Sequence, residues 1–158
     1  MKKLFQKLLL ILSMKLKKNK IKYKHKTDIH NMFAPRELVP IIMQFGNFNS
    51  VVDVGCGLGT FLRAFKENGV EKILGIDGPW CKKELLFQNI SEEEFLEFDL
   101  ERDFNLNYKF DLAISLEVAE HLSPSRASSF VENLCNLSDT VLFSAAVPYQ
   151  GGENHLNE

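Results

Sequence analysis

Apolar and polar residues follow one another along this chain in two different periods. Five short segments are continuously apolar or rich in β-branched residues, as buried strands are, and they lie at 51–54, 72–77, 95–98, 108–115 and 139–147. Between them apolar residues recur at helical spacing, which predicts helices at about 35–45, 60–68, 79–89 and 124–134. Such alternation of strands and helices is typical of an α/β domain built on a parallel sheet.

A glycine-rich turn, GCGLG at 55–59, joins the first predicted strand to the helix after it. Glycines let the backbone approach a ligand closely, and a helix that starts beyond them directs free N–H groups to the same place. The dinucleotide fingerprint G-x-G-x-x-G does not fit, because position 60 is Thr60. No lysine follows the glycines, as a P-loop requires. The glycines alone leave an ordinary turn open as an alternative.

Acidic residues stand at the ends of the later strands. Asp77 closes the second predicted strand, 22 residues after Gly55, where a carboxylate that holds two ribose hydroxyls is expected. Gly78 follows it in a turn, and Trp80 is expected either to stack on a ligand ring or to pack in the core. Asp99 follows the third predicted strand in the same way. The acidic run at 92–94 is expected to be solvated surface.

Two segments resemble a known enzyme family. VDVGCGLG at 52–59 resembles the first motif of class I S-adenosylmethionine-dependent methyltransferases, and LEVAEHL at 116–122 is similar to the E-V-x-E-H segment of many small-molecule methyltransferases. The resemblance runs through most of 51–158. It implies a Rossmann-like, doubly wound parallel sheet of order 3-2-1-4-5 with S-adenosylmethionine as its cofactor. The cofactor-binding residues that it implies are Asp53, Gly55, Cys56, Gly57, Gly59, Asp77, Gly78, Asp99, Leu100 and Glu117.

The resemblance also implies a role for each of these residues. The glycine loop passes the methionine part of the cofactor, and Asp53 bonds to loop amides or reaches the cofactor's amino end. Asp99 accepts a hydrogen bond from the adenine amine, while the backbone N–H of Leu100 meets a ring nitrogen. Glu117 lies where the fourth strand opens onto the sulfonium and the methyl acceptor.

Three residues are candidates for catalysis. Glu117 is expected to orient the acceptor, and His121 and His155 are candidate general bases, since an imidazole exchanges protons near neutral pH. A purely structural i, i+4 pair of Glu117 and His121 on a short helix is the alternative. The carboxylates and His155 near the C-terminal end resemble a metal cluster, but their spacing does not require an ion, so no metal site is predicted.

Charge is divided unevenly along the 158 residues, whose net charge is −2. Residues 1–26 carry ten lysines and no acid, whereas 27–158 carry nine basic and all 21 acidic residues, a net of −12. An acidic body argues against nucleic-acid binding, which needs Lys or Arg on phosphates. Three cysteines without C-x-x-C spacing predict neither disulfides nor zinc and favour the cytoplasm.

The chain divides into a basic N-terminal extension, 1–27, and a cofactor-binding domain, 28–158. The apolar run at 8–12 is too short to span a bilayer, which takes about 20 residues. A basic amphipathic helix at an anionic membrane surface is one reading of the extension; packing on the domain or fraying in solution is the other. A cleaved signal peptide is disfavoured because lysines resume directly after the apolar run.

The resembled family usually has seven strands, in the order 3-2-1-4-5-7-6, and this sequence supplies five. We therefore expect strands 6 and 7 to be lacking, methyl transfer to a small-molecule acceptor to be impaired by truncation, and the fifth strand to promote self-association. A non-catalytic, degenerate methyltransferase domain that serves as an interaction protein is the alternative.

Overall fold

A single parallel sheet forms the centre of the domain. The computed structural model describes residues 30–152 and 154–157. Its strands are β1 Ser50–Val54, β2 Lys72–Asp77, β3 Phe95–Glu97, β4 Leu112–Leu116 and β5 Val141–Ser144. Each neighbouring pair is parallel, and the spatial order is β3-β2-β1-β4-β5. The predicted fold class and strand order are confirmed.

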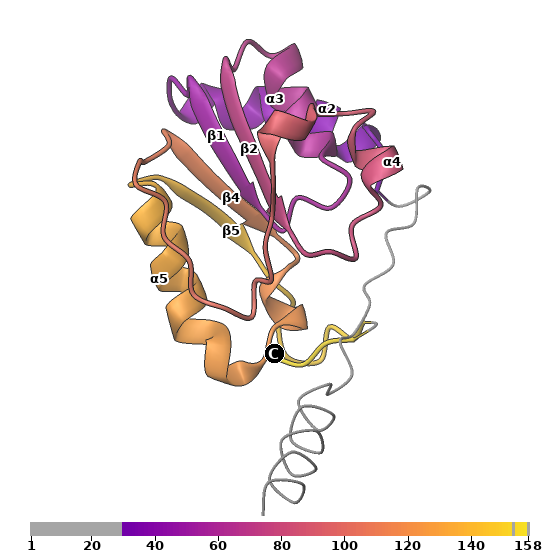
Figure 1. Cartoon of the computed structure of the whole chain (residues 1–158), viewed down its shortest axis with the longest axis vertical. Coiled ribbons are helices and arrows are strands. Elements are labelled where there is room, and N and C mark those ends of the chain that lie inside the picture. The colour runs from indigo at the N-terminus through magenta and orange to yellow at the C-terminus, as the bar shows by residue number, and fades with distance from the viewer. Residues whose placement is uncertain (1–29, 153, 158) are drawn as a thin grey trace, which may run out of the picture.

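Helices cover both faces of this sheet (Figure 1). They are α2 Phe33–Ile42, continued by a 3-10 turn Met43–Phe45, α3 Thr60–Glu67, α4 Lys83–Leu86 and α5 Ala127–Leu137. Val51 and its neighbours pack with α2 and α3 in one core, while Val52 packs with α5 in a second core on the other face. Successive residues of a strand point to opposite faces, so a strand buried on both must be apolar throughout.

The register aligns the carboxyl ends of the strands at one edge. Val54 of β1 lies beside Ile76 of β2, one residue before the end of that strand. Leu116, the last residue of β4, pairs with Ser144, the last residue of β5. Residues that follow these strands therefore gather at one edge, where ligands bind in open parallel sheets.

Two predicted elements are shorter than expected. The helix expected at 79–89 is reduced to α4, because residues 78–82 form a turn in which the Cys81 thiol donates to the Gly57 carbonyl at 2.7 Å. The fourth strand begins at Leu112 instead of 108, because the Asp111 carboxylate accepts the backbone N–H groups of Asn49 and Ser50, each at 2.8 Å. Both corrections arise from contacts distant in the sequence.

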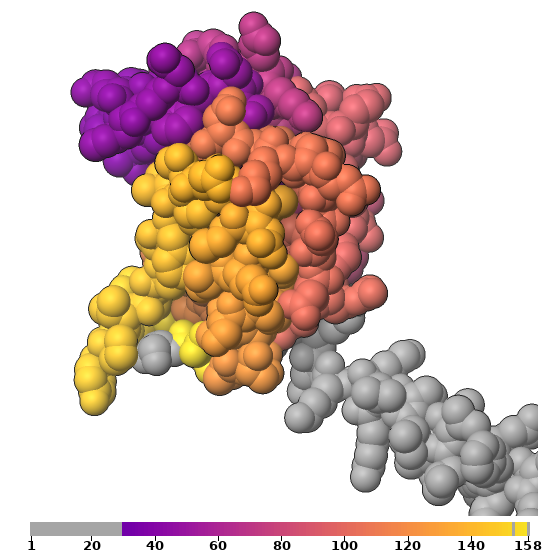
Figure 2. Space-filling model, turned by 90° about the vertical axis from the view of Figure 1, so that its left-hand side faces the viewer, coloured from indigo at the N-terminus to yellow at the C-terminus, as the bar shows by residue number. Residues whose placement is uncertain are grey.

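The fifth strand is also shorter than the predicted 139–147. It ends at Ser144 because its partner β4 ends opposite that residue. Among the described strands β5 lies at one edge of the sheet, beside α5 and the C-terminal residues in Figure 2, and the side chain of Phe143 is 43% exposed. Self-association through this edge stays a prediction.

The basic extension, 1–27, lies outside the described residues, as does its predicted helix. Within the part of the chain that the structure describes, every helix is too short or too polar to cross a membrane. Cys56, Cys81 and Cys135 are all free thiols, so the predicted absence of a disulfide framework agrees with the structure.

Candidate functional site

A cavity of about 680 Å³ opens at the carboxyl edge of the sheet, between the glycine loop and α2. Ligand-binding pockets typically measure about 300–1,000 Å³. Ala34, Pro35 and Leu38 of α2 line one wall, as expected for a helix placed before the first strand. The predicted site residues on its other walls are Asp53, Gly55, Cys56, Gly57, Asp77, Leu100, Glu117 and His121.

Asp77 links the end of β2 to the glycine loop. Its carboxylate accepts the N–H of Gly57 at 2.8 Å and the N–H of Gly78 at 2.6 Å. Burial raises the pKa of Asp77, while these two donors act in the opposite direction. The side chain is 4% exposed, so the loop and the strand end are held in a fixed relation around it.

Asp53 lies beside Asp77 in the floor of the cavity. Burial, and then repulsion by the Asp77 carboxylate, raise the pKa of Asp53 from 3.8 to about 8. At neutral pH the Asp53 carboxyl is therefore mostly protonated in the protein without a ligand. A positively charged ligand group placed beside it would favour its ionised form.

Two buried thiols adjoin these carboxylates. Burial and the charge of Asp77 raise the pKa of Cys81 to about 12, and burial raises that of Cys56 as well. Thiols that stay protonated are poor nucleophiles. Cys81 therefore acts as a hydrogen-bond donor to the glycine loop, and neither thiol is a candidate for covalent chemistry.

Glu117 follows β4 in a left-handed backbone conformation, with φ 57°. Its N–H donates to the Ser144 carbonyl at 3.0 Å, and its carboxylate accepts the Ser144 hydroxyl at 2.8 Å. Only Ala119–His121 forms a helical turn here, and it is a 3-10 turn. The alternative of an i, i+4 helical pair of Glu117 and His121 is therefore wrong, because Glu117 lies outside any helix.

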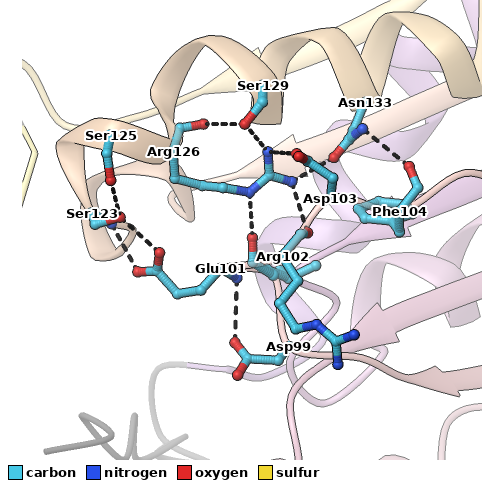
Figure 3. Close-up of polar contacts among 11 residues, drawn as sticks. Asp99, Glu101, Arg102, Asp103, Phe104, Ser123, Ser125, Arg126, Ser129 and Asn133 are labelled. Atoms are coloured by element: carbon cyan, nitrogen blue, oxygen red, sulfur yellow. Dashed lines mark hydrogen bonds and ion pairs between the residues drawn. The ribbon is translucent and has the colours of Figure 1, made fainter. Parts of the chain in front are cut away.

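Arg126 anchors the loop that carries Asp99 and Leu100 (Figure 3). Its guanidinium, 4% exposed, donates to the Leu100 carbonyl at 2.8 Å and to the Asp103 carboxylate at 2.7 Å. Ser123, predicted to cap the following helix, instead donates its hydroxyl and N–H to Glu101, each at 2.8 Å, and the helix starts with a 3-10 turn, Pro124–Arg126. These bonds fix Leu100 at the cavity wall.

The remaining candidates lie apart from the cavity lining. Gly59, Gly78, Asp99 and His155 are not among the described residues that line it. Asp99 is half-buried, and its carboxylate accepts the N–H of Glu101 at 3.3 Å. Sequence reasoning missed Ser144, Thr60 and His30 in the lining. Ser144 carries no local signal, since it belongs to the site only through the pairing of β4 with β5.

The glycine loop, the buried carboxylates and the strand order define an α/β cofactor-binding domain. The chain belongs to the methyltransferase domain family, whose model matches residues 3–140. Among curated proteins, the mitochondrial ubiquinone biosynthesis O-methyltransferase of Dictyostelium discoideum is 26% identical over 122 residues. That match covers 66% of this chain and 37% of the relative, so the chain spans little more than a third of that protein.

Solved structures share the fold. An O-methyltransferase family protein from Burkholderia thailandensis superposes with a TM-score of 0.55 at 14% identity, covering 68% of this chain and 35% of that one. The S-adenosylmethionine-bound amino pentose methyltransferase CalS10 from Micromonospora echinaspora gives a TM-score of 0.59 at 16% identity, covering 70% and 48%. At these identities the likeness establishes the fold and nothing finer.

Gly55→Ala should lower the free energy of unfolding by about 2 kcal/mol. Gly55 has φ 89°, and a Cβ there would lie 2.4 Å from Cγ2 of Val118. Gly69→Ala is the matched control, because Gly69 has φ 92° and no atom within 4 Å of such a Cβ. Urea unfolding should show a smaller loss for Gly69→Ala, of about 1 kcal/mol. Equal losses would mean that contact with Val118 does not restrict the loop.

Proposed function

We propose that the cavity binds S-adenosylmethionine and that the chain transfers its methyl group to a small-molecule acceptor. The observation that carries this proposal is the joining of the glycine loop to Asp77, with Asp53 beside it, in a member of the methyltransferase family. Two acceptor oxygens at a strand end suit two vicinal ribose hydroxyls. The loop then meets the methionine part, whose ammonium and sulfonium carry positive charge.

The polar end of the cavity supplies the acceptor side. Glu117 and Ser144 form a hydrogen-bonded pair there, and His121 lies on the same wall. The Glu117 carboxylate favours the positively charged sulfonium and orients an acceptor hydroxyl or amine. Leu100, 2% exposed and held by Arg126, offers its backbone to the adenine, and Trp80 offers its ring.

Methyl transfer needs only one bond to form and one to break. A lone pair of the acceptor oxygen or nitrogen attacks the methyl carbon, and the electrons of the broken C–S bond stay on sulfur. The acceptor's proton passes to solvent or to a nearby base. Catalysis then rests on holding the acceptor atom about 3 Å from the carbon. The names of the ubiquinone-biosynthesis and amino pentose relatives support a small-molecule acceptor.

S-adenosylmethionine and S-adenosylhomocysteine should both raise the melting temperature of the full chain, and NAD should not. At a ligand concentration 100 times the dissociation constant, binding adds about 2.7 kcal/mol to the stability. A shift with NAD and none with either adenosyl compound would exclude this proposal. Binding without S-adenosylhomocysteine formation from any phenol, alcohol or amine acceptor would favour the alternative, a non-catalytic binding domain.

A further inference from the structure

Two histidines and a glutamate meet beside the cavity. Glu120 and His121 belong to the 3-10 turn Ala119–His121, and His155 lies in the loop that follows β5. One potential ligand atom from each residue lies within 4.8 Å of the other two. Protein atoms bind a first-row divalent metal at about 2.0–2.2 Å, so two ligands of one ion are about 3–4 Å apart. Small side-chain rotations would bring all three to that distance.

Glu120 is an independent sign of a missing cation. Its side chain is 2% exposed, and within the described part of the chain its Oε2 is buried with no hydrogen-bond partner. A buried carboxylate oxygen without a partner costs several kcal/mol unless a cation or donor meets it. Native proteins keep few such atoms, and most of them mark a ligand or a water. A cation among these three side chains would satisfy this oxygen.

Backbone contacts hold His155 against the turn. The N–H groups of Leu156 and Asn157 donate to the Glu120 carbonyl at 2.6 and 3.2 Å. The two imidazole rings meet edge to face with centroids 5.4 Å apart. A Cβ on Gly152 would lie 2.1 Å from Nε2 of His155, so the ring requires glycine at this position.

The orientation of His121 also suits a metal ligand. Its Nδ1 lies 3.3 Å from the Asn154 carbonyl, so a proton on Nδ1 donates to that oxygen. The lone pair then belongs to Nε2. A bond of this kind from the second ring nitrogen fixes the tautomer of metal-binding histidines.

We propose that Glu120, His121 and His155 bind a divalent first-row transition-metal ion such as Zn²⁺. Two imidazoles and one carboxylate form a donor set that suits zinc, iron or cobalt better than magnesium or calcium. Three protein ligands leave at least one coordination position, and His121 also lines the cavity, so that position faces the ligand. The sequence had suggested these histidines as general bases; here they are ligands.

A role for the ion in catalysis rests on the proposed function. An acceptor hydroxyl bound at the open position would lose its proton to solvent more readily, because a divalent cation stabilises the oxyanion. The oxygen lone pair then attacks the methyl carbon, and the C–S electrons stay on sulfur. This role restricts the acceptor to a molecule with a hydroxyl that reaches both the ion and the methyl group.

Zn²⁺ titration of the chelator-treated full chain by calorimetry, with Co²⁺ absorption as a second probe, tests the site. We expect one saturable ion that Glu120→Gln and His155→Ala each weaken at least ~100-fold, since loss of an outer partner alone costs about 10–100-fold. Gly152→Ala keeps all three ligands but displaces the His155 ring, and should weaken binding about 10-fold. Glu132→Gln, an exposed position on α5, should leave the affinity unchanged.

Thermal melts separate loss of the ion from loss of the fold. Zn²⁺ should raise the melting temperature of the wild type and not that of Glu120→Gln. Without metal, Glu120→Gln should be at least as stable as the wild type, because a neutral amide is easier to bury than a carboxylate. Equal Zn²⁺ affinity in the wild type, Glu120→Gln and His155→Ala, or no saturable binding at millimolar Zn²⁺, would overturn the site.

S-adenosylhomocysteine binding without metal, measured in parallel, separates the two proposals. Zn²⁺ binding without cofactor binding keeps the metal site and removes its catalytic role. Cofactor binding without Zn²⁺ binding keeps the proposed function and rejects the metal.

Discussion

Asp77→Ala should weaken binding of S-adenosylhomocysteine at least ~100-fold, equivalent to about 3 kcal/mol. Two ribose hydroxyls would lose a charged acceptor, and hydrogen bonds to charged groups contribute about 1.5–3 kcal/mol each. Asp77 also accepts the N–H groups of Gly57 and Gly78, so its loss frees the loop that should contact the methionine part. Isothermal titration of the wild type and the variant measures the change.

Glu92→Ala is the control for this substitution. Glu92 is an exposed acid at the start of a 3-10 turn, Glu92–Glu94, and its loss should change the dissociation constant less than about two-fold. Asp77→Asn keeps one acceptor oxygen and should fall between the two. Equal effects of Asp77→Ala and Glu92→Ala would show that the ribose does not bind at the end of β2.

Loss of Asp77 need not destabilise the fold. Burial raises the pKa of Asp77, and its charge raises that of Asp53, so the two carboxylates repel one another in the empty site. Removing one relieves this repulsion, while the loop loses two hydrogen bonds. Unfolding curves recorded beside the titrations would distinguish a weakened site from an unfolded protein.

The sheet could be predicted because burial on both faces leaves a strong local signal. The predicted strand at 72–77 has the bounds of β2, since Ile73 and Ile76 must be apolar on opposite faces and Asp77 must end the strand. The helix at 79–89 was overpredicted for the converse reason. Helical spacing alone could not reveal that Cys81 bonds to Gly57 and keeps the chain in a turn.

The site divides in the same way. Asp53 and Asp77 could be found from the sequence, because parallel strands place residues near their carboxyl ends at a common edge. The meeting of Glu120 with His155 could not. It depends on backbone bonds from Leu156 and Asn157 to Glu120, which any residues except proline could make and which leave no pattern in the sequence.

Asp53→Asn should remove most of a pH-dependent loss of stability. The pKa of Asp53 is about 8 in the folded protein and 3.8 as the ordinary value, so between these values the unfolded chain releases a proton that the folded chain retains. The folded state is therefore favoured most at low pH and loses this advantage as pH rises through the window. One proton corresponds to about 1.4 kcal/mol per pH unit, or about 4 kcal/mol between pH 5 and 8.

Urea unfolding at pH 5, 6, 7 and 8 measures this effect as the difference between variant and wild type. The variant should gain on the wild type steadily with pH, because asparagine carries no proton that titrates there. Asp139→Asn is the control: its carboxylate is 88% exposed beside Lys109, so its curve should run parallel to the wild type. Parallel curves for Asp53→Asn as well would mean that Asp53 is ionised in the folded protein. In that case the positive end of the cofactor would meet a preformed charge, and its binding would release no proton at neutral pH.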